Sequence, residues 1–549
     1  MARTGKEYLE GLRDGREIWI GGERIDDVTT HRATRNAAHA YAHMYDMQHE
    51  PEFRDVLTYE SATGARANRG YQIPHSYEDL VARRGAIKTF SESNYGFVGR
   101  SPDYKASMWA GFAAAPEVFD TDDYKGSDNV LAHYAYLRDN DLFQGHAITN
   151  PQINRGNDTA SGQPEEFLYC GVTHERDDGV IVNGAEMIAT GAMFSDEMHI
   201  SSMQPYGPGD EAYAVTFSVP MNTPGVKLIG RTSYEATATS VFDYPLSKRY
   251  DETDALMVFE DVFVPWRRVF IYRDLQVTWD HWFTTPALNF MIHQFATRQW
   301  TKLEFLFGLA VKLTKQNGIY RLPAVQERLG VLFGKVMTIK ALVIGAEANY
   351  ERFESAADVI VPNNEMIQSF KAIGPLLYRE VIDGIRWLIG GGPMQAPASF
   401  EAFIGEGIAP VSRRYMQGAG VDGVTRTKVL KAVWDAVGTE FASRHELYER
   451  FALGPMHVTM MAMLGEAHID VYEALADDLL GSYDLDTAVA EAAHWTPPTR
   501  PTRARRGGTR VGAVEGPGTI ATVKAQGITV PRPNPIVLMA GRARAGAAR

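Results

Sequence analysis

The sequence predicts an α+β protein in which a mainly helical region, a central antiparallel β domain and a helical bundle follow one another along the chain. Between residues 142 and 275, short strand-like runs alternate with turn signals such as Asp178-Gly179. From residue 276 to about residue 490, long stretches with helical periodicity return, separated by short breaks. Long helices joined by short connections are typical of a four-helix bundle, so we expect the third region to form one.

The two ends of the chain complete this organisation. Residues 1–141 open with a helical stretch and continue with EIWIGGERI, where Gly21-Gly22 between two strand-like runs predicts a tight hairpin, and mixed helical segments follow. Residues 491–549 are rich in proline, glycine, alanine and arginine. This composition predicts a basic, disordered tail without a catalytic role.

Composition limits the class of protein. A chain of 549 residues that is 45% hydrophobic can bury several cores, so a large multi-domain protein is expected. The N-terminal segment has no apolar leader, and apolar runs such as residues 331–346 contain lysines and fall short of the roughly 20 residues that span a bilayer. We therefore expect a cytoplasmic protein that does not cross a membrane. The formal net charge of −13 argues against nucleic-acid binding.

Cysteine content and nucleotide motifs narrow the chemistry. Cys170 is the only cysteine, which excludes intramolecular disulfides and cysteine-rich metal sites, and no metal site is expected. Neither a GxGxxG fingerprint after a strand nor a Walker loop occurs. We therefore do not expect NAD(P)H to bind to this chain.

A first polar cluster lies in GRSPDYKASMWAG, residues 99–111. Arg100 is a permanent cation with a planar fork of donors, which suits an anionic oxygen. If the segment is helical after Pro102, Tyr104 lies about one turn beyond Arg100 and faces the same cavity. The plain alternative is the start of a helix with a surface arginine.

A second cluster, DLFQGHAITNPQINRG at residues 141–156, packs amides, a hydroxyl, an arginine and His146 into a turn-rich stretch. Such groups suit the hydrogen-bonding edge of an isoalloxazine ring, and a histidine titrates near neutral pH. Thr190 stands in a third cluster at the end of a strand, and the Gly- and Pro-rich loop Gln204–Ala212 is expected to cover a substrate as a lid. The alternatives are a structural histidine, a plain β-turn and a simple hairpin connection.

These blocks occur in the order and approximate spacing of the 4-hydroxyphenylacetate 3-hydroxylase family of flavin-dependent monooxygenases, which the chain resembles from its N-terminal segment to about Ser482. The blocks VFEDVFVPWRRVF and SRHELYERF belong to the same resemblance. The order of helical domain, β domain and bundle is similar to the acyl-CoA dehydrogenase fold, which binds flavin between its β domain and its bundle. Such a fold typically forms a homotetramer with flavin sites at the interfaces.

The resemblance implies residues for two kinds of contact. The residues expected to contact the substrate are Arg100, Ser101, Tyr104, His146, Gln204 and Tyr206. The residues expected to contact FAD are His146, Ile148, Thr149, Gln152, Ile153, Asn154, Arg155, Thr190, Ser443, Arg444, His445 and Glu446. His293 resembles the histidine that serves as base toward the phenol in the halophenol and nitrophenol branch, and its plain alternative is a buried helix histidine.

The resemblance also implies a reaction. Reduced FAD, supplied by a separate NAD(P)H:flavin reductase, reacts with O2 to give a C4a-hydroperoxide, which hydroxylates a phenol ortho to its hydroxyl group. A phenolate is a better nucleophile than a phenol, so the site needs a base, either His146 or His293, and a cation, Arg100, that favours the anion. A 4-hydroxyphenylacetate-like phenol is the expected substrate. The alternatives are a halophenol, nitrophenol or tyrosine-derived substrate, or a flavin dehydrogenase or dehydratase on the same fold.

Overall fold

The structure is a computed structural model that describes residues 2–154, 156, 159–454 and 456–491. The chain divides into two compact units, residues 1–456 and 457–549. Except for Glu491, the tail predicted at residues 491–549 lies outside the described residues.

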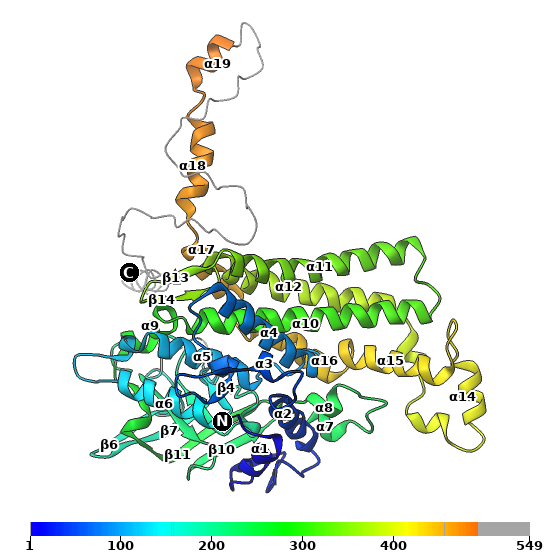
Figure 1. The fold of residues 1–549 in the computed structure, drawn as a ribbon, viewed down its shortest axis with the longest axis horizontal. Helices are drawn as coiled ribbons and strands as arrows, with labels where there is room; N and C mark the ends of the chain where they lie inside the picture. The colour runs from blue at the N-terminus through cyan, green and yellow to red at the C-terminus, as the bar shows by residue number, and fades with distance from the viewer. Residues whose placement is uncertain (1, 155, 157–158, 455, 492–549) are drawn as a thin grey trace. The chain divides into compact units, whose positions relative to one another are not determined.

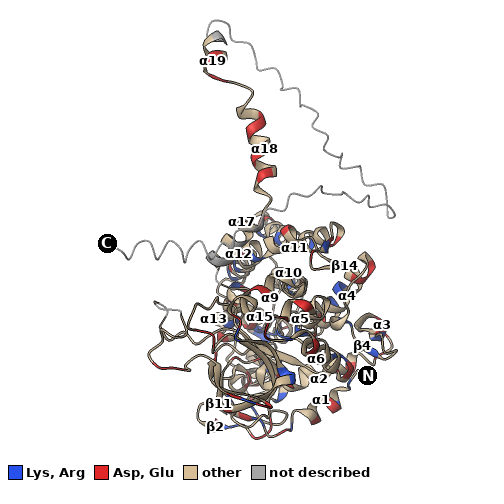
Figure 2. Ribbon diagram, turned by 90° about the vertical axis from the view of Figure 1, so that its left-hand side faces the viewer, with Lys and Arg blue, Asp and Glu red and all other residues tan. Residues whose placement is uncertain are grey.

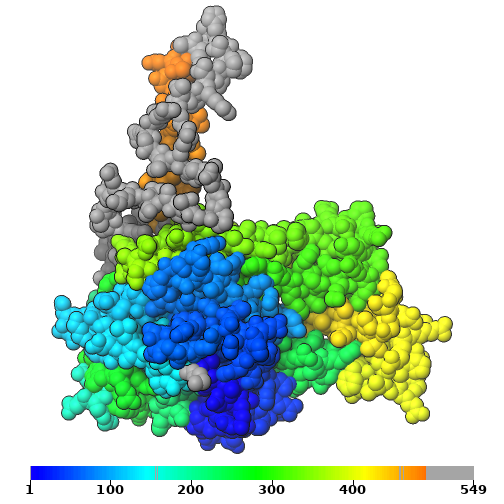
Figure 3. Space-filling view, viewed as in Figure 1, coloured from blue at the N-terminus to red at the C-terminus, as the bar shows by residue number. Residues whose placement is uncertain are grey.

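The first unit opens with a mainly helical region, as the sequence predicts. Its elements are α1 (Gly5–Gly11), β1 (Glu17–Ile20), β2 (Glu23–Arg24), α2 (Arg35–Met47), α3 (Arg54–Leu57), β3 (Thr58–Glu60), β4 (Arg66–Asn68), α4 (Tyr77–Ser93), α5 (Pro102–Ala114) and α6 (Ser127–Asn140). Reciprocal capping boxes start α1 and α4, where Thr4 and Ser76 accept a backbone N–H of the first turn. The residues of this region form a continuous layer, blue to cyan, over one face of the unit (Figure 3).

The central region forms two sheets. Its strands are β5 (Gln144–Ala147), β6 (Gly171–Arg176), β7 (Gly179–Glu186), β8 (Glu197–Ile200), β9 (Val215–Pro220), β10 (Val226–Gly230), β11 (Ala255–Pro265) and β12 (Val269–Tyr272). The six-stranded sheet has the order β2-β1-β10-β11-β7-β6, and the four-stranded sheet the order β12-β9-β8-β5. Most neighbours are antiparallel, as predicted, but β1 pairs with β10 and β5 with β8 in parallel. Parallel pairing requires a long connection, which the chain supplies in both cases.

The hairpin predicted around Gly21-Gly22 is present, and it joins the sheet of the β domain. Strands β1 and β2 pair antiparallel across these glycines, both of which have positive φ. Glu17 of β1 then lies opposite Lys227 of β10. The first strand of the chain is therefore part of the central sheet rather than of the helical region.

The third region is the predicted bundle. Its elements are α9 (Leu275–Thr284), α10 (Ala287–Gln316), α11 (Pro323–Ala348), β13 (Glu351–Phe353), β14 (Ala356–Val361), α12 (Asn364–Ile389), α13 (Gly392–Gln395), α14 (Ala409–Tyr415), α15 (Gly423–Val437) and α16 (Glu440–Phe451). Helix α10 packs against α11, α12 and α15 within the bundle, and against α4 and α5 of the first region (Figure 1). Residues 287–303 of α10 are buried throughout. This helix is the shared wall between the bundle and the N-terminal helices.

Helix α11 is long and apolar enough to cross a membrane by length and composition, and a third of its most apolar stretch is buried. Core helices of soluble proteins pass the same test. Because α11 packs against α10 and α12, we interpret it as a bundle helix. Val331 and Phe333 on the outer face of α11 are about half exposed, and so is Trp387 on α12.

The second unit contains two further helices, α18 (Ile469–Leu480) and α19 (Leu485–Glu491), after α17 (Met456–Glu466), which begins at the boundary between the units. Helix α18 is exposed along its whole length. It carries apolar side chains such as Tyr472 and Leu475 together with the acidic residues coloured red in Figure 2. Such a helix presents a face suited to another protein surface.

Candidate active site

Arg100 occupies the loop that leads into α5, and the protein fixes both its backbone and its side chain. The backbone N–H groups of Gly99 and Arg100 both donate to Oε2 of Glu252 at 2.9 Å. Nη1 of Arg100 donates to the hydroxyl of Tyr448 at 2.8 Å. The side chain is buried, and Nε has no hydrogen-bond partner among the described residues. Arg100 is therefore a buried cation with a free donor and not a surface arginine.

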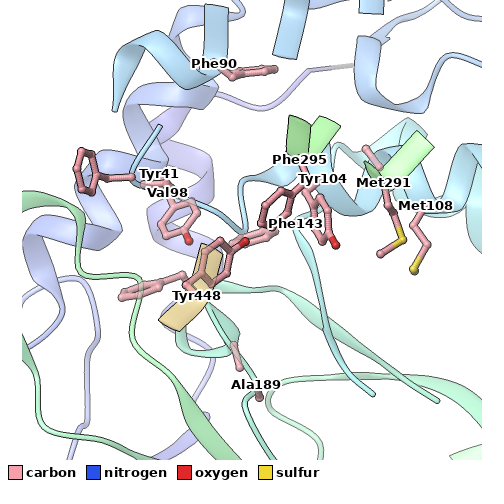
Figure 4. Close-up of a cluster of buried hydrophobic side chains, with 14 of the residues drawn as sticks. Tyr41, Phe90, Val98, Tyr104, Met108, Phe143, Ala189, Met291, Phe295 and Tyr448 are labelled. Atoms are coloured by element: carbon pink, nitrogen blue, oxygen red, sulfur yellow. The ribbon is translucent and has the colours of Figure 1, made fainter. Parts of the chain in front are cut away.

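Tyr104 faces Arg100, because α5 begins at Pro102 as the sequence predicts. The guanidinium carbon of Arg100 lies 4.5 Å from the ring centroid of Tyr104 and 5.1 Å from that of Tyr448. Phe295 of α10 stacks on Tyr448 with ring centroids 5.6 Å apart. Figure 4 shows the rings of Tyr104, Phe295 and Tyr448 gathered together. Ser101, also predicted at the site, caps α5 and accepts from Gln294 of α10 at 3.2 Å.

His146 lies on β5 beside these rings. Its ring centroid is 6.1 Å from that of Tyr104. Burial lowers the pKa of His146 well below its usual range, and the nearby positive charge of Arg100 adds to the effect. The imidazole is therefore neutral at pH 7, and its Nδ1 has no partner among the described residues. The structure thus brings Arg100, Tyr104 and His146 together.

His293 lies elsewhere in the fold. Its Nε2 is 2.7 Å from Oε1 of Glu347 on α11, and the other oxygen of Glu347 is 3.2 Å from Nε of Arg84. On α10, Met291 and Phe295 are among the residues that turn toward the Tyr104 cluster (Figure 4). His293, two residues from each, belongs to a different face of the helix. These contacts of His293 agree with the plain alternative, in which it is a buried structural histidine of the helix.

Two residues predicted to contact FAD meet at one carboxylate. Oγ1 of Thr190 donates to Oδ1 of Asp254 at 2.6 Å, and Nε of Arg444 donates to Oδ2 at 2.8 Å. Burial acts in the opposite direction, but Arg444 and Arg231 hold the pKa of Asp254 well below its usual range. Arg444 also donates to Oε1 of Glu252 at 2.6 Å. The same helix, α16, thus reaches both Thr190 and the carboxylate that holds Arg100.

The other predicted residues of α16 have different surroundings. His445 is buried, with Nδ1 3.2 Å from Nζ of Lys302. Glu446 lies 3.1 Å from Arg450 and is partly exposed, and Ser443 is exposed and donates to the carbonyl of Thr439. Of the four predicted residues of α16, Ser443 and Glu446 therefore present their side chains outward, and Arg444 and His445 are buried.

The loop after β5 and the predicted lid contact each other. Nδ2 of Asn150 donates to Oε1 of Gln204 at 3.2 Å and to the hydroxyl of Tyr206 at 3.3 Å. Ile148 and Thr149 hold this loop to other segments of the same chain, because their carbonyls accept from the backbone N–H groups of Met203 and Met187. The side chains that point outward, all exposed, are Gln152, Ile153 and Asn154. Arg155 lies outside the described residues.

A buried ionic network fixes α16 against α10. Glu449 accepts two hydrogen bonds of 2.7 Å from Arg298 and one of 3.0 Å from Lys302. Burial alone would raise the pKa of Glu449, but Arg298 and Lys302 outweigh it and lower the pKa to about 2. Since Tyr448 directly precedes Glu449, this network also positions the Tyr448 hydroxyl, which accepts from Arg100. Among the described residues, no group of three or more His, Cys, Asp or Glu side chains is placed to hold a metal ion.

Comparison with known proteins identifies the family. Residues 4–271 match the model of the 4-hydroxyphenylacetate 3-hydroxylase N-terminal part, and residues 280–481 match that of its C-terminal part. The chain belongs to the 4-hydroxyphenylacetate 3-hydroxylase family. Several of its relatives are named monooxygenases, and the chain is an enzyme of that class.

Individual relatives span nearly the whole family region. The 4-hydroxyphenylacetate 3-monooxygenase oxygenase component of Thermus thermophilus is 35% identical over 83% of this chain and 92% of its own length. The oxygenase component of a 4-nitrophenol 2-monooxygenase from Rhodococcus sp is 36% identical over 88% of this chain and 93% of its own length. A crystal structure of an oxygenase component of 4-hydroxyphenylacetate 3-monooxygenase with FAD and 4-hydroxyphenylacetate has a TM-score of 0.83 at 33% identity, covering 87% of this chain and 98% of that one. The predicted α+β fold, with a helical domain, a β domain and a helical bundle in this order, is thus confirmed.

Several residues at the site of this 4-hydroxyphenylacetate 3-hydroxylase family member were not predicted. They are Lys105, Glu252, Asp254 and Tyr448. The sequence could have indicated Lys105, because it is the only charged residue between Tyr104 and the end of the mostly apolar helix α5 at Ala114. The other three residues contact the site across more than 60 positions of the chain. A local sequence pattern cannot predict such contacts.

Proposed function

We propose that the protein is the oxygenase component of a two-component monooxygenase that hydroxylates a phenol ortho to its hydroxyl group, using reduced FAD and O2. The observation that carries this proposal is the buried group of Arg100, Tyr104 and His146. It offers a cation with a free donor, a hydroxyl and a neutral imidazole, all within one cluster. These are the groups that a phenolate oxygen requires in a site closed to water.

The residues present fit a bound flavin. The exposed Gln152 and Asn154 offer amide donors and acceptors on the loop that follows β5, the strand that carries the buried His146, whose Nδ1 has no partner among the described residues. Thr190 is joined through Asp254 to Arg444, which also donates to Glu252, the carboxylate that holds the backbone of Arg100. Bound reduced FAD supplies the electrophilic oxygen atom after reaction with O2.

Arg100 binds the phenol oxygen and favours its anionic form. A cation at hydrogen-bond distance lowers the pKa of an acid, and a charge-assisted hydrogen bond contributes about 1.5–3 kcal/mol. Glu252 fixes the backbone of Arg100, and the hydroxyl of Tyr448 holds its guanidinium, before the substrate arrives. Little energy is then lost in ordering this side chain on binding.

His146 is the histidine that we propose at the substrate. It lies beside Tyr104, whereas His293 is committed to Glu347. A neutral imidazole next to Arg100 is suited to accept or donate one hydrogen bond without adding a second positive charge. The lid residues Gln204 and Tyr206 and the residue Ser101 complete the proposed substrate site.

Two partners follow from this proposal. A separate NAD(P)H:flavin reductase supplies the reduced FAD, because the family relatives are named as oxygenase components. We also propose a homotetramer in the cytoplasm, with flavin sites completed between subunits. The apolar side chains left exposed on α11, α12 and α18 support an assembly, and they are Val331, Phe333, Leu376, Trp387 and Leu475.

The test is an assay with reduced FAD, O2 and a panel of phenols. The panel contains 4-hydroxyphenylacetate, phenol, a halophenol and 4-nitrophenol, since relatives are named for the first and the last. We expect a catechol product with at least one of them, with hydroxylation next to the phenolic hydroxyl. Tight binding of reduced FAD without any hydroxylated product would refute the proposal.

A further inference from the structure

Lys105 follows Tyr104 on α5 and is a buried lysine without an anionic partner. Its side chain is 1% exposed. Nζ donates to the sulfur of Met108 at 3.1 Å, lies 3.9 Å from the sulfur of Met291, and is 5.0 Å from the ring centroid of Tyr104. Figure 4 shows the two methionine sulfurs close together beside Tyr104. No carboxylate lies within salt-bridge distance of Nζ in the part of the chain that the structure describes.

A second buried lysine shows that this arrangement is not a general feature of the fold. Lys302 is equally buried, but its Nζ donates to Glu449 at 3.0 Å and belongs to the network of α16. A buried ammonium is stable only when it is paired. Burial lowers the pKa of Lys105 well below its usual range, and the charge of Arg100 lowers it further. Burial and Arg100 therefore favour the neutral form of Lys105, an amine with a lone pair, at the proposed phenol site.

Among the described residues, the hydrogen-bond contacts of this amine are with neutral groups, and the acidic residue of its own helix, Asp103, accepts from Gln294 instead. Arg100 and Tyr104 belong to its own segment, His146 faces it from β5 and His199 from β8, where the two histidines are paired in register. Helix α10 contributes only the thioether of Met291. Burial lowers the pKa values of both histidines well below the usual range, so both are neutral at pH 7. The anion that complements a protonated Lys105 must come with the substrate.

We propose that Lys105 accepts the phenolic proton of the substrate and is a catalytic residue of the hydroxylation. This inference rests on the proposed function. In this step the O–H bond of the phenol breaks, its electron pair stays on the oxygen, and the proton forms an N–H bond with the lone pair of Nζ. The products are a phenolate beside Arg100 and an ammonium beside Tyr104, so net charge is conserved and no further reactant is needed.

Lys105 suits this role better than His146. An unperturbed amine is a much stronger base than an imidazole, with ordinary pKa values of about 10.4 and 6.5. The penalty for burying the ammonium applies only while the site lacks an anion, and it disappears when the phenolate forms next to it. His146 remains neutral and hydrogen-bonds to the phenolate. The amine thus becomes a strong base when a phenol is bound.

The test measures the ionisation of the bound phenol rather than turnover. The full-length protein is loaded with reduced FAD without oxygen, so a phenol binds without reacting, and the ultraviolet difference spectrum reports phenol or phenolate. The two probes are 4-hydroxyphenylacetate, a weakly acidic phenol, and 4-nitrophenol, an acidic one. The variants are Lys105→Met, which removes the base, and Lys105→Arg, which keeps a cation but cannot accept a proton. Lys88→Met is the matched control, because Lys88 is partly buried on α4 and paired with Glu304 outside the site.

We expect unchanged protein and Lys88→Met to bind 4-hydroxyphenylacetate as phenolate at pH 7. Both Lys105 variants should raise its apparent pKa in the complex, and about one pKa unit corresponds to a tenfold smaller ratio of phenolate to phenol. Binding of 4-nitrophenol as phenolate should change little, because this probe ionises without help. In air, the Lys105 variants should lose hydroxylation of 4-hydroxyphenylacetate and recover it as the pH rises.

Three results would overturn the role of Lys105. The unchanged protein could bind 4-hydroxyphenylacetate as the neutral phenol, which decides the question even if no variant folds. Lys105→Met could leave the phenolate spectrum unchanged, which would assign the proton to another base such as His146. Lys105→Arg could restore full ionisation, which would show that only positive charge is needed. If the unchanged protein hydroxylates no phenol in air, the proposed function fails instead, so the two failures are distinguishable.

Discussion

The guanidinium of Arg100 donates to the hydroxyl of Tyr448 at 2.8 Å, although 348 positions of the chain separate the two residues. Arg100 precedes α5 in the first region, and Tyr448 lies on α16 at the end of the bundle. The contact therefore joins the substrate side of the proposed site to the helix whose N-terminal half reaches Thr190 through Asp254. Substitutions on α16 are therefore expected to alter phenol binding, because they change the position of Arg100.

Tyr448→Phe removes the acceptor but keeps the ring that stacks on Phe295. A hydrogen bond to a charged group contributes about 1.5–3 kcal/mol, so a less fixed Arg100 should weaken phenol binding by roughly tenfold or more. The measurement is the dissociation constant of the phenol with reduced FAD bound and oxygen absent. Unchanged affinity together with unchanged product per reduced FAD would show that Tyr448 does not position Arg100.

Gly99→Ala tests the same contact from the other side. A Cβ at residue 99 would lie 2.3 Å from the ring and hydroxyl of Tyr448, so the tyrosine must move away from Arg100. Overpacking of this kind costs about 1–3 kcal/mol of stability. We expect uncoupling, seen as hydrogen peroxide formed in place of hydroxylated product. The control is Gly85→Ala on α4, where the nearest atom would be 3.9 Å away and the helix should gain up to about 1 kcal/mol.

His146→Gln and His293→Gln separate the two candidate histidines. His146 lies beside Tyr104, so its replacement should reduce product per reduced FAD while leaving the midpoint of thermal unfolding nearly unchanged. His293 pairs with the buried Glu347, so its replacement should mainly lower the unfolding midpoint, since a buried carboxylate loses a partner. Coupling efficiency and thermal unfolding are measured on both variants. The reverse pattern would assign the substrate role to His293.

Glu449→Gln tests the network that holds α16. Removing one member of a buried, hydrogen-bonded ion pair costs about 3–5 kcal/mol, because Arg298 and Lys302 would remain as uncompensated buried cations. The measurement is the free energy of unfolding in denaturant. The matched control is Glu304→Gln, whose partly exposed pair with Lys88 should contribute less than about 1 kcal/mol. Equal losses in the two variants would contradict a special role for Glu449.

The same residue gives a pH dependence with a defined sign. Its pKa is about 2 in the folded protein and 4.5 without the fold, so the folded state favours the charged form. The contribution of Glu449 to stability is complete above about pH 4.5 and is lost as the pH falls toward 2. In Glu449→Gln this part of the acid dependence should be absent. An identical acid limb in both proteins would place the titrating group elsewhere.

Local sequence patterns predicted most of the helices and strands, and they predicted that Tyr104 lies near Arg100. Pro102 starts a helix, so the phase of Tyr104 relative to Arg100 followed from 3.6-residue geometry. The position of His293 did not follow, because a helix buried on all sides gives no periodic signal for which face meets the substrate and which meets Glu347. The parallel pairing of β5 with β8 was also not predicted, since it depends on strands that are not consecutive in the sequence.

The parallel pair β1–β10 sets the order in which this protein can fold during synthesis. Residues 17–20 leave the ribosome early, but their partner residues 227–230 are made more than 200 residues later. At translation rates of about 5–20 residues per second, the N-terminal hairpin waits roughly 10–40 s before its sheet exists. During that interval β1 exposes an unpaired edge, and chaperone binding to the nascent chain should concentrate on this segment.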